Sequence, residues 1–310
     1  MKYGLWDLLI CPSCKTKLDL VVDEFKNNEV KEGKLNCHRC KHDYLIVGYI
    51  PRFVTNDAYA GNFSYEWLVH RQTQLDSVSG THESESIFVN KTGFGSNLNG
   101  KLVLDAGCGS GRFMEIAQKF GAEVVGVDLS FSVDSAIDTL GGGNFIQADI
   151  NHLPFKDNVF DCVYSIGVLH HTPNTEKAFK VLVPLVKKGG EIAIWVYSNE
   201  GIAMKIYNSI SNFYRIFTTR ISQSILYRIC HASIGLYYLQ KIPVLGLFLR
   251  ALIPSSPHPI KSWRVLDTFD WYSPKYQWKH TYKEVTKWFT DCGLEFCRLD
   301  IPISVKGKKN

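Results

Sequence analysis

The stretch from Leu102 to Arg112 constrains the fold of this chain more than any other. Three apolar residues lead into Asp105, and glycines then follow at alternate positions, Gly107, Gly109 and Gly111. A helical stretch of mixed apolar and polar residues comes directly afterwards. This order predicts a buried strand, a tight turn and the start of a helix, which is where a doubly wound α/β sheet binds a nucleotide-like cofactor.

A second acid narrows the kind of cofactor. The strand predicted at 123–128 ends in Asp128, 19 positions after Gly109, where a carboxylate can accept hydrogen bonds from both ribose hydroxyls. The glycines fall one residue short of the dinucleotide pattern G-x-G-x-x-G, and the absence of a G-K-[ST] sequence excludes a phosphate-binding P-loop. Asp105 beside the turn would repel a pyrophosphate but would suit a cationic group.

These residues give the chain a resemblance to the class I S-adenosylmethionine-dependent methyltransferases, in particular to the methyltransferase type 11 family. Four motifs carry the resemblance in the family's order: 103–111, 125–128, 147–149 and 160–171. It implies a seven-stranded, doubly wound Rossmann-like sheet with S-adenosylmethionine as cofactor and methyl transfer as activity. The cofactor contacts that it implies are Asp105, Gly107, Cys108, Gly109, Gly111, Asp128, Leu129, Asp149, Ile150 and Ser165.

Residues at the carboxyl ends of the next two predicted strands, 144–149 and 160–165, lie where doubly wound sheets bind ligands. In the family, the acid at the position of Asp149 hydrogen-bonds the adenine amino group, and the residue at Ile150 lies against the ring. The alternative for Asp149 is a loop cap. His170 and His171 follow the fourth strand. A histidine there can take a proton from a hydroxyl as a general base, or the pair can simply shape the pocket.

Four cysteines near the N-terminus form two C-x-x-C pairs, Cys11 with Cys14 and Cys37 with Cys40, separated by 22 residues. Together they can complete a tetrahedral four-sulfur zinc site, which is closed and therefore structural. We expect residues 1–54 to form a zinc ribbon, similar to the small zinc-binding domain that activates tRNA methyltransferases. Zinc would supply folding energy to so small a unit; binding of a partner or substrate is the alternative.

The remaining chain divides into three regions. Residues 55–99 are expected to form a linker and a helical lid over the cofactor, with Tyr65, Gln72 and Gln74 as lid contacts and with Phe63 and Trp67 packing on the sheet. Residues 100–198 and 281–310 are expected to form the methyltransferase domain, which ends in an antiparallel strand pair. Residues 199–280 are expected to be a helical, basic insertion after the fifth strand that caps the acceptor site.

The insertion has an unusual composition. Between Gly201 and Ser262 it carries seven Lys or Arg and no Asp or Glu, with apolar residues crowded between the cations. This pattern suits helices that rest on an anionic membrane surface or cover a lipid-like acceptor. A nucleic-acid surface is a rival interpretation, and a buried cap with solvated cations is the third.

The segment 267–281 crowds acids, histidine and aromatic residues without clear periodicity. In related enzymes this stretch faces the acceptor, so Asp270, Tyr272, Tyr276 and His280 are candidate acceptor residues. The alternative is that these aromatic residues anchor the insertion to the core.

Composition limits where such a chain works. No secretory signal and no apolar run of 18 residues appear, so we expect no transmembrane segment. Paired cysteines in an unsecreted chain favour a reducing, cytoplasmic compartment, with peripheral membrane contact allowed.

The expected function is methyl transfer to a small or lipid-linked acceptor, with oxygen as target atom. An RNA methyltransferase and a non-catalytic cofactor-binding scaffold are the alternatives; the N/D-P-P-[YF] sequence of base-amine methylation is missing after the fourth strand.

Overall fold

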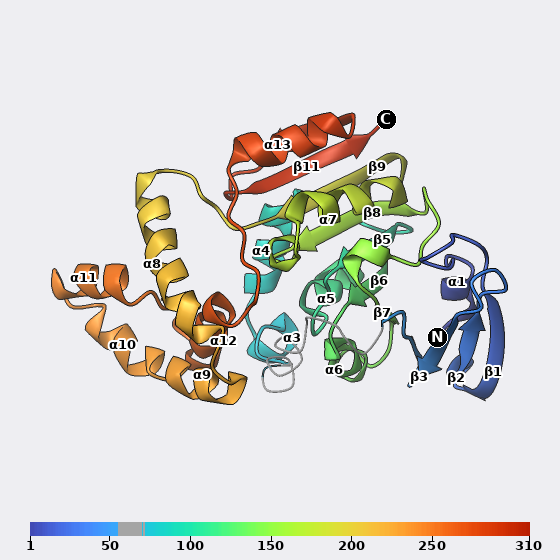
Figure 1. Cartoon of the computed structure of the whole chain (residues 1–310), viewed down its shortest axis with the longest axis horizontal. Coiled ribbons are helices and arrows are strands. Elements are labelled where there is room, and N and C mark those ends of the chain that lie inside the picture. The colour runs from blue at the N-terminus through green and yellow to red at the C-terminus, as the bar shows by residue number, and fades with distance from the viewer. Residues whose placement is uncertain (55–69, 71) are drawn as a thin grey trace.

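A computed structural model describes residues 1–54, 70 and 72–310 of the chain (Figure 1). The linker predicted at 55–61 and the residues Phe63, Tyr65 and Trp67 lie outside the described residues. Three parts follow one another along the long axis: an N-terminal ribbon, a central α/β unit and a group of helices at the opposite end (Figure 1).

Within the described chain, seven strands form the central sheet in the order β10-β11-β9-β8-β5-β6-β7. Strands β5 to β9 are parallel neighbours, and β11 pairs antiparallel with both β9 and β10. The predicted doubly wound sheet with a final antiparallel pair is confirmed. Its strands are β5 Leu102–Ala106, β6 Glu123–Asp128, β7 Asn144–Gln147, β8 Phe160–Ile166, β9 Val186–Trp195, β10 Leu294–Arg298 and β11 Ser304–Lys309.

Helices cover both faces of this sheet because the strands are apolar on both sides, as buried parallel strands are. Along β5, Leu104 belongs to one core cluster and Val103 to another. The first cluster lies under α7 (Thr175–Leu182) and α13 (Tyr282–Asp291); the second lies under α4 (Glu83–Thr92), α5 (Arg112–Lys119) and α6 (Ser132–Thr139). Short helices complete the unit: α3 Asp76–Ser79, η1 Ile150–His152, η2 Leu169–His171 and η3 Val183–Leu185.

The ribbon is joined to the sheet along its β7 edge. Within residues 1–54, the strands β1 (Asp19–Lys26), β2 (Glu29–Asn36), β3 (Asp43–Val47) and β4 (Ile50–Pro51) follow α1 (Tyr3–Trp6) and pair in sequence order. After β4, Arg52 bridges Gln147 of β7, and the backbone N–H of Phe53 donates to the Gln147 carbonyl at 2.7 Å. Because ribbon residues such as Leu5 and Leu9 share one core cluster with Phe155, the two units pack as one body.

The helical insertion leaves the sheet after β9 and returns before α13 (Figure 1). Its helices are α8 Ile202–Thr218, α9 Gln223–Cys230, α10 Ser233–Leu239, α11 Leu245–Leu252 and α12 Lys261–Tyr272. A small separate core, which includes Leu226, Val265 and Phe269, holds α9 against α12. The start of the segment that lacked clear periodicity therefore belongs to a helix, α12, whose buried face this core stabilises.

Candidate functional site

The glycine turn after β5 has the backbone geometry that its sequence predicts. Gly107 has a φ of +94° and Gly111 a φ of +87°, a region that residues with a Cβ rarely adopt. A Cβ on Gly107 would also lie 2.4 Å from the Val168 side chain. Asp128 at the end of β6 closes the turn, because its carboxylate accepts the backbone N–H groups of Gly109 at 3.0 Å and Ser130 at 2.9 Å.

A cavity of about 360 Å³ opens directly beyond this turn. The wall nearest the sheet contains six of the ten predicted cofactor residues, namely Gly107, Cys108, Gly109, Asp128, Leu129 and Ile150. Gln74, expected as a lid contact, also lines the cavity, whereas Gln72 does not. Carboxyl ends of parallel strands meet here, so the site lies where a doubly wound sheet binds its ligand.

The other four predicted cofactor residues lie behind this wall or beside it. Asp105 is buried and accepts a hydrogen bond from the Tyr164 hydroxyl at 2.9 Å; burial raises the pKa of its carboxyl to about 8. Ser165 is also buried and donates to the Ala106 carbonyl, and Gly111 is not a lining residue. Asp149 caps η1, because its carboxylate accepts the Asn151 backbone N–H at 2.8 Å. In this structure Asp149 therefore acts as the loop cap.

The two histidines differ in access to the cavity. His171 lines it, and its Nδ1 lies 2.8 Å from the Tyr276 carbonyl oxygen. His170 does not line the cavity; its fully buried ring lies 3.9 Å from the Tyr197 ring, centroid to centroid. Burial lowers the pKa of both imidazoles, that of His171 to about 4. Both rings are therefore neutral at pH 7, and His171 is the one that faces a ligand.

The far half of the cavity is built by the insertion and by the end of β9. Helix α12 presents Trp263, Leu266, Asp267, Asp270 and Trp271 to it. Trp195 at the end of β9, Tyr197 two residues further on, and three residues of α4 complete this half; the latter are Glu83, Ile87 and Lys91. The result is a chamber whose aromatic and aliphatic walls carry several ionisable groups, an arrangement that can hold and orient an organic ligand.

Together with Asp267 and Glu83, Asp270 is one of the acids that line this chamber. The Tyr197 hydroxyl donates to its carboxylate at 3.2 Å. Burial raises the pKa of Asp270 to about 6, although the Tyr197 hydrogen bond and Arg215 oppose that shift. A carboxyl with such a pKa is ionised near neutral pH and can take a proton.

The other three candidate acceptor residues lie away from the chamber, which corrects the expectation that all four face one acceptor. Tyr272 points into the small core of the insertion, and its hydroxyl donates to the Pro254 carbonyl at 2.6 Å. Tyr276 and His280 line two separate surface hollows, and His280 lies 3.0 Å from the Thr175 hydroxyl. Here the anchoring alternative describes the structure: Tyr272 is the last residue of α12 and packs in the insertion core, and Tyr276 and His280 follow the helix.

Several lining residues were not singled out from the sequence, namely Lys91, Arg112, Trp195, Tyr197, His258, Trp263 and Asp267. Two signals could have found some of them. Trp195 and Tyr197 stand at the carboxyl end of the fifth parallel strand, where ligand-binding residues gather. Trp263, Asp267 and Asp270 have spacings of four and three, which place residues on one face of a helix.

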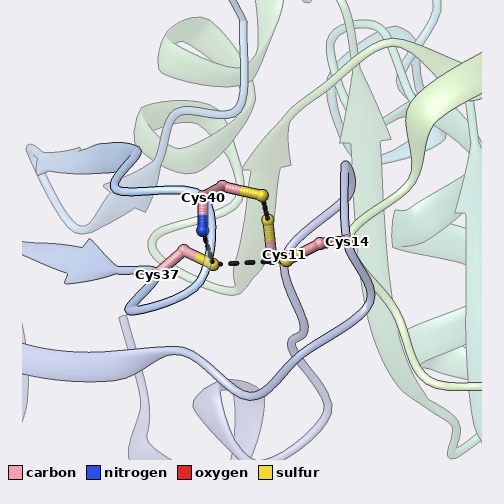
Figure 2. A group of neighbouring side chains, drawn as sticks. All are labelled: Cys11, Cys14, Cys37 and Cys40. Atoms are coloured by element: carbon pink, nitrogen blue, oxygen red, sulfur yellow. Dashed lines mark hydrogen bonds between the residues drawn. The ribbon is translucent and has the colours of Figure 1, made fainter.

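The four N-terminal cysteines converge, as Figure 2 shows. Their sulfur atoms all lie within 4.8 Å of one another, and the sulfurs of Cys14 and Cys37 are 3.4 Å apart. Two hairpin-like loops, 11–14 and 37–40, each supply one pair. Four sulfurs at this separation fit a tetrahedral metal ion of the size of zinc.

The fold is a Rossmann-like unit whose cavity extends from the glycine turn to α12. Comparison with known families gives the class directly. Residues 104–194 match the family model described as methyltransferase domain, and residues 2–48 match the Trm112p-like protein model. Both predicted resemblances are confirmed: the chain carries a domain of the methyltransferase family behind a Trm112p-like segment.

Individual relatives match mainly over the methyltransferase domain. The chain is 30% identical over 133 residues to the ubiquinone/menaquinone biosynthesis C-methyltransferase of Haemophilus ducreyi, covering 39% of this chain and 49% of that one. It is 31% identical over 137 residues to the tRNA U34 carboxymethyltransferase of Nautilia profundicola, covering 40% and 45%. The matched region covers between 21% and 60% of the length of these curated relatives.

A solved SAM-dependent methyltransferase from Aquifex aeolicus has 15% sequence identity and a TM-score of 0.43, with 79% of this chain and 96% of that one covered. Among the described residues, no helix has both the length and the apolar character needed to cross a membrane.

Proposed function

We propose that the chain is an S-adenosylmethionine-dependent methyltransferase that methylates a hydroxyl of a small or lipid-linked acceptor. One observation carries this proposal: a single cavity joins the glycine turn of a methyltransferase-family domain to an aromatic chamber built by α12. Both reactants can then occupy one enclosed space. Such alignment supplies much of the rate in a displacement reaction, up to roughly 7–11 kcal/mol in the best intramolecular cases.

The residues of the cofactor half have distinct tasks in this proposal. Asp128 accepts the ribose hydroxyls, the turn from Gly107 to Gly109 lets the backbone approach closely, and Ile150 packs on the base. S-adenosylmethionine, when bound, supplies an electrophilic methyl group on a sulfonium that leaves without acid assistance. The protein therefore has to position the acceptor and, for a hydroxyl, to take its proton.

Asp270 is our candidate for the proton acceptor. It lines the acceptor chamber and is held by Tyr197, and a base whose pKa lies near the working pH is the most effective. His171, predicted as the base from the sequence, lines the same cavity. Its lowered pKa makes it a weaker base than Asp270, so its task is to shape the chamber.

The outer surface of the insertion favours a lipid-linked acceptor. Of the 29 exposed large apolar side chains among the described residues, 18 lie between Ile202 and Ile260, which is about a fifth of the chain. On α8, Ile202, Ile206, Phe213 and Phe217 have the spacing of one helical face, and each is more than half exposed. Apolar surface of this extent on a soluble domain marks an interaction site.

The charges on the same surface fit an anionic membrane. Six cations of the insertion are exposed, namely Lys205, Arg220, Arg228, Lys241, Arg250 and Lys261. Each contributes about 1 kcal/mol to binding near an anionic lipid surface, and the apolar side chains add burial in the interfacial region. The insertion would rest on the bilayer while α12 faces the active site. We further propose a reducing, cytoplasmic compartment, because paired metal-binding cysteines must stay reduced.

Vesicle binding tests this assignment. Purified protein is sedimented with vesicles of phosphatidylcholine alone or with phosphatidylglycerol added, across salt concentrations. We expect binding only to the anionic vesicles, weakened by salt and lost in a Phe213→Ser/Phe217→Ser variant. Leu45→Ser is the matched control, because Leu45 is an exposed apolar residue of the ribbon. Absence of binding to anionic vesicles would refute the membrane assignment and leave the insertion as an ordinary cap.

An RNA acceptor is an alternative with a specific observation behind it. The relative from Nautilia is named as acting on tRNA, and the basic insertion suits RNA as well. RNA that competes with vesicles for the protein and becomes methylated would favour this alternative. A scaffold protein would bind the cofactor and never consume it on any acceptor. In all three cases we assign to the four cysteines a structural zinc ion that stabilises the ribbon.

A further inference from the structure

Arg112 is a partly buried cation, one of whose donors, Nη2, has no partner among the described residues. It opens helix α5 directly after the glycine turn, and its side chain lines the cavity. Its Nε donates to the Ser84 hydroxyl at 2.9 Å, and the guanidinium lies 4.8 Å from the ring centroids of Phe113 and Trp263. Nη2 is buried and has no hydrogen-bond partner among the residues that the structure describes. Such a donor is costly unless something pairs with it.

Lys91 is a second, partly buried cation on the same cavity. Its Nζ lies 3.1 Å from the centroid of the Trp195 ring. Within the described chain, the Trp195 ring is the partner of this Nζ, which has no hydrogen bond or ion pair there. Burial first, and then the nearby positive charge of Arg112, lower the pKa of Lys91 to about 7. Both cations line the same cavity, and the charge of Arg112 disfavours the charged form of Lys91.

The acids of the cavity already have donors of their own. Glu83 lies 3.1 Å from His258 Nε2, and Asp267 accepts the Ser256 hydroxyl at 3.0 Å. Asp270 accepts the Tyr197 hydroxyl. Glu83 and Asp267 attract Arg112 through space, but neither carboxylate forms an ion pair with Arg112 or Lys91 within the described residues. Buried charges are normally paired, so the partner of these two cations is expected to be a ligand.

We propose that Lys91 and Arg112 form an anion subsite that binds a carboxylate or phosphate of a reactant in the cavity. An anion between them would satisfy Nη2, remove their mutual repulsion and restore the charge of Lys91. Two sources share this chemistry: the amino-acid carboxylate of the cofactor and an anionic group of the acceptor, such as the phosphate of a lipid carrier. The proposed function enters this inference only through the two reactants named as ligands.

Calorimetry with three probes separates the sources. The probes are S-adenosylhomocysteine, methylthioadenosine (which lacks the amino-acid part) and inorganic pyrophosphate added to the protein saturated with S-adenosylhomocysteine. The variants are Lys91→Met and Arg112→Met, with Lys91→Arg to keep the charge. Lys119→Met is the matched control, because Lys119 is an exposed cation at the other end of α5. Circular dichroism checks that each variant is folded.

The expected loss is about tenfold to a hundredfold for a charged hydrogen bond. Loss of affinity for S-adenosylhomocysteine with methylthioadenosine unchanged would assign the subsite to the cofactor. Loss of pyrophosphate binding alone would assign it to the acceptor. Folded variants with all three affinities unchanged would overturn the proposal. If the wild type binds no S-adenosylhomocysteine, the proposed function fails. The anion subsite is then tested separately, by comparing pyrophosphate binding to the ligand-free wild type and to the Lys91 and Arg112 variants.

Discussion

Substitution of Gly107 by Ala tests how the turn and the cavity wall depend on each other. Two separate costs are expected. At a φ of +94°, an alanine is strained by roughly 1–2 kcal/mol, partly offset because the unfolded chain loses freedom. The new Cβ would also lie 2.4 Å from both γ carbons of Val168, and such overpacking costs about 1–3 kcal/mol more.

Two further variants separate these costs. Gly100 has a φ of +70° with nothing within 4 Å of its Cβ position, so Gly100→Ala should show the backbone strain alone, about 1 kcal/mol after the offset. Val168→Ala removes the two γ carbons, but its Cβ stays 2.7 Å from the new Cβ. The double variant Gly107→Ala/Val168→Ala should therefore recover only part of the overpacking cost, with a coupling between the two positions of about 1 kcal/mol.

Urea denaturation followed by circular dichroism measures the free energies of unfolding, and calorimetry measures the affinity for S-adenosylhomocysteine in parallel. We expect affinity to fall in Gly107→Ala, because Gly107 and Val168 both line the cavity. Additive effects, with a coupling below about 0.5 kcal/mol, would show that the chain avoids the collision by moving. In that case the close approach of turn and wall would not be the reason for a glycine at position 107.

Three other results are expected. The purified protein should carry about one equivalent of zinc that Cys40→Ser loses, as elemental analysis can show; a wild type free of metal contradicts the site. The rate of methyl transfer should fall as pH drops through about 6, because burial raises the pKa of Asp270 to about 6 and the protonated carboxyl accepts no proton; an Asp270→Asn variant with wild-type rate and profile would refute this. Burial raises the pKa of Asp105 from 3.8 to about 8, so its folded form holds the proton more tightly. The cofactor-free wild type should therefore lose stability as pH rises from about 4 to 8. Asp105→Asn should remove this loss. Urea denaturation should show that the free energy of unfolding of the variant, relative to that of the wild type, is higher at pH 8 than at pH 5. The same difference at both pH values would contradict the raised pKa of Asp105.

The sequence predicts the cofactor half of the site well and the acceptor half poorly, for a physical reason. The cofactor half consists of strand ends and a glycine turn, which are local features with fixed spacing. Asp128 and Gly107 could be placed on these grounds alone. The acceptor half is assembled from α4, β9 and α12, so its members lie far apart in sequence and meet only through packing.

The four acceptor candidates show the limit most clearly. Asp270 and Tyr272 are two positions apart on α12, and on a helix such residues point to different sides. One therefore faces the chamber while the other fills a small core. Without knowing that this segment is helical, no pattern in the residues themselves distinguishes the two.

The attachment of the ribbon to β7 has a consequence for solubility. β7 is the outermost strand of its sheet, and such a strand offers unpaired backbone groups to any other extended chain. Arg52 and Phe53 occupy part of that edge through Gln147. Removal of the metal by a chelator would loosen the ribbon and so expose the edge of β7. The protein is then expected to aggregate through this edge while the cavity at the glycine turn is still folded.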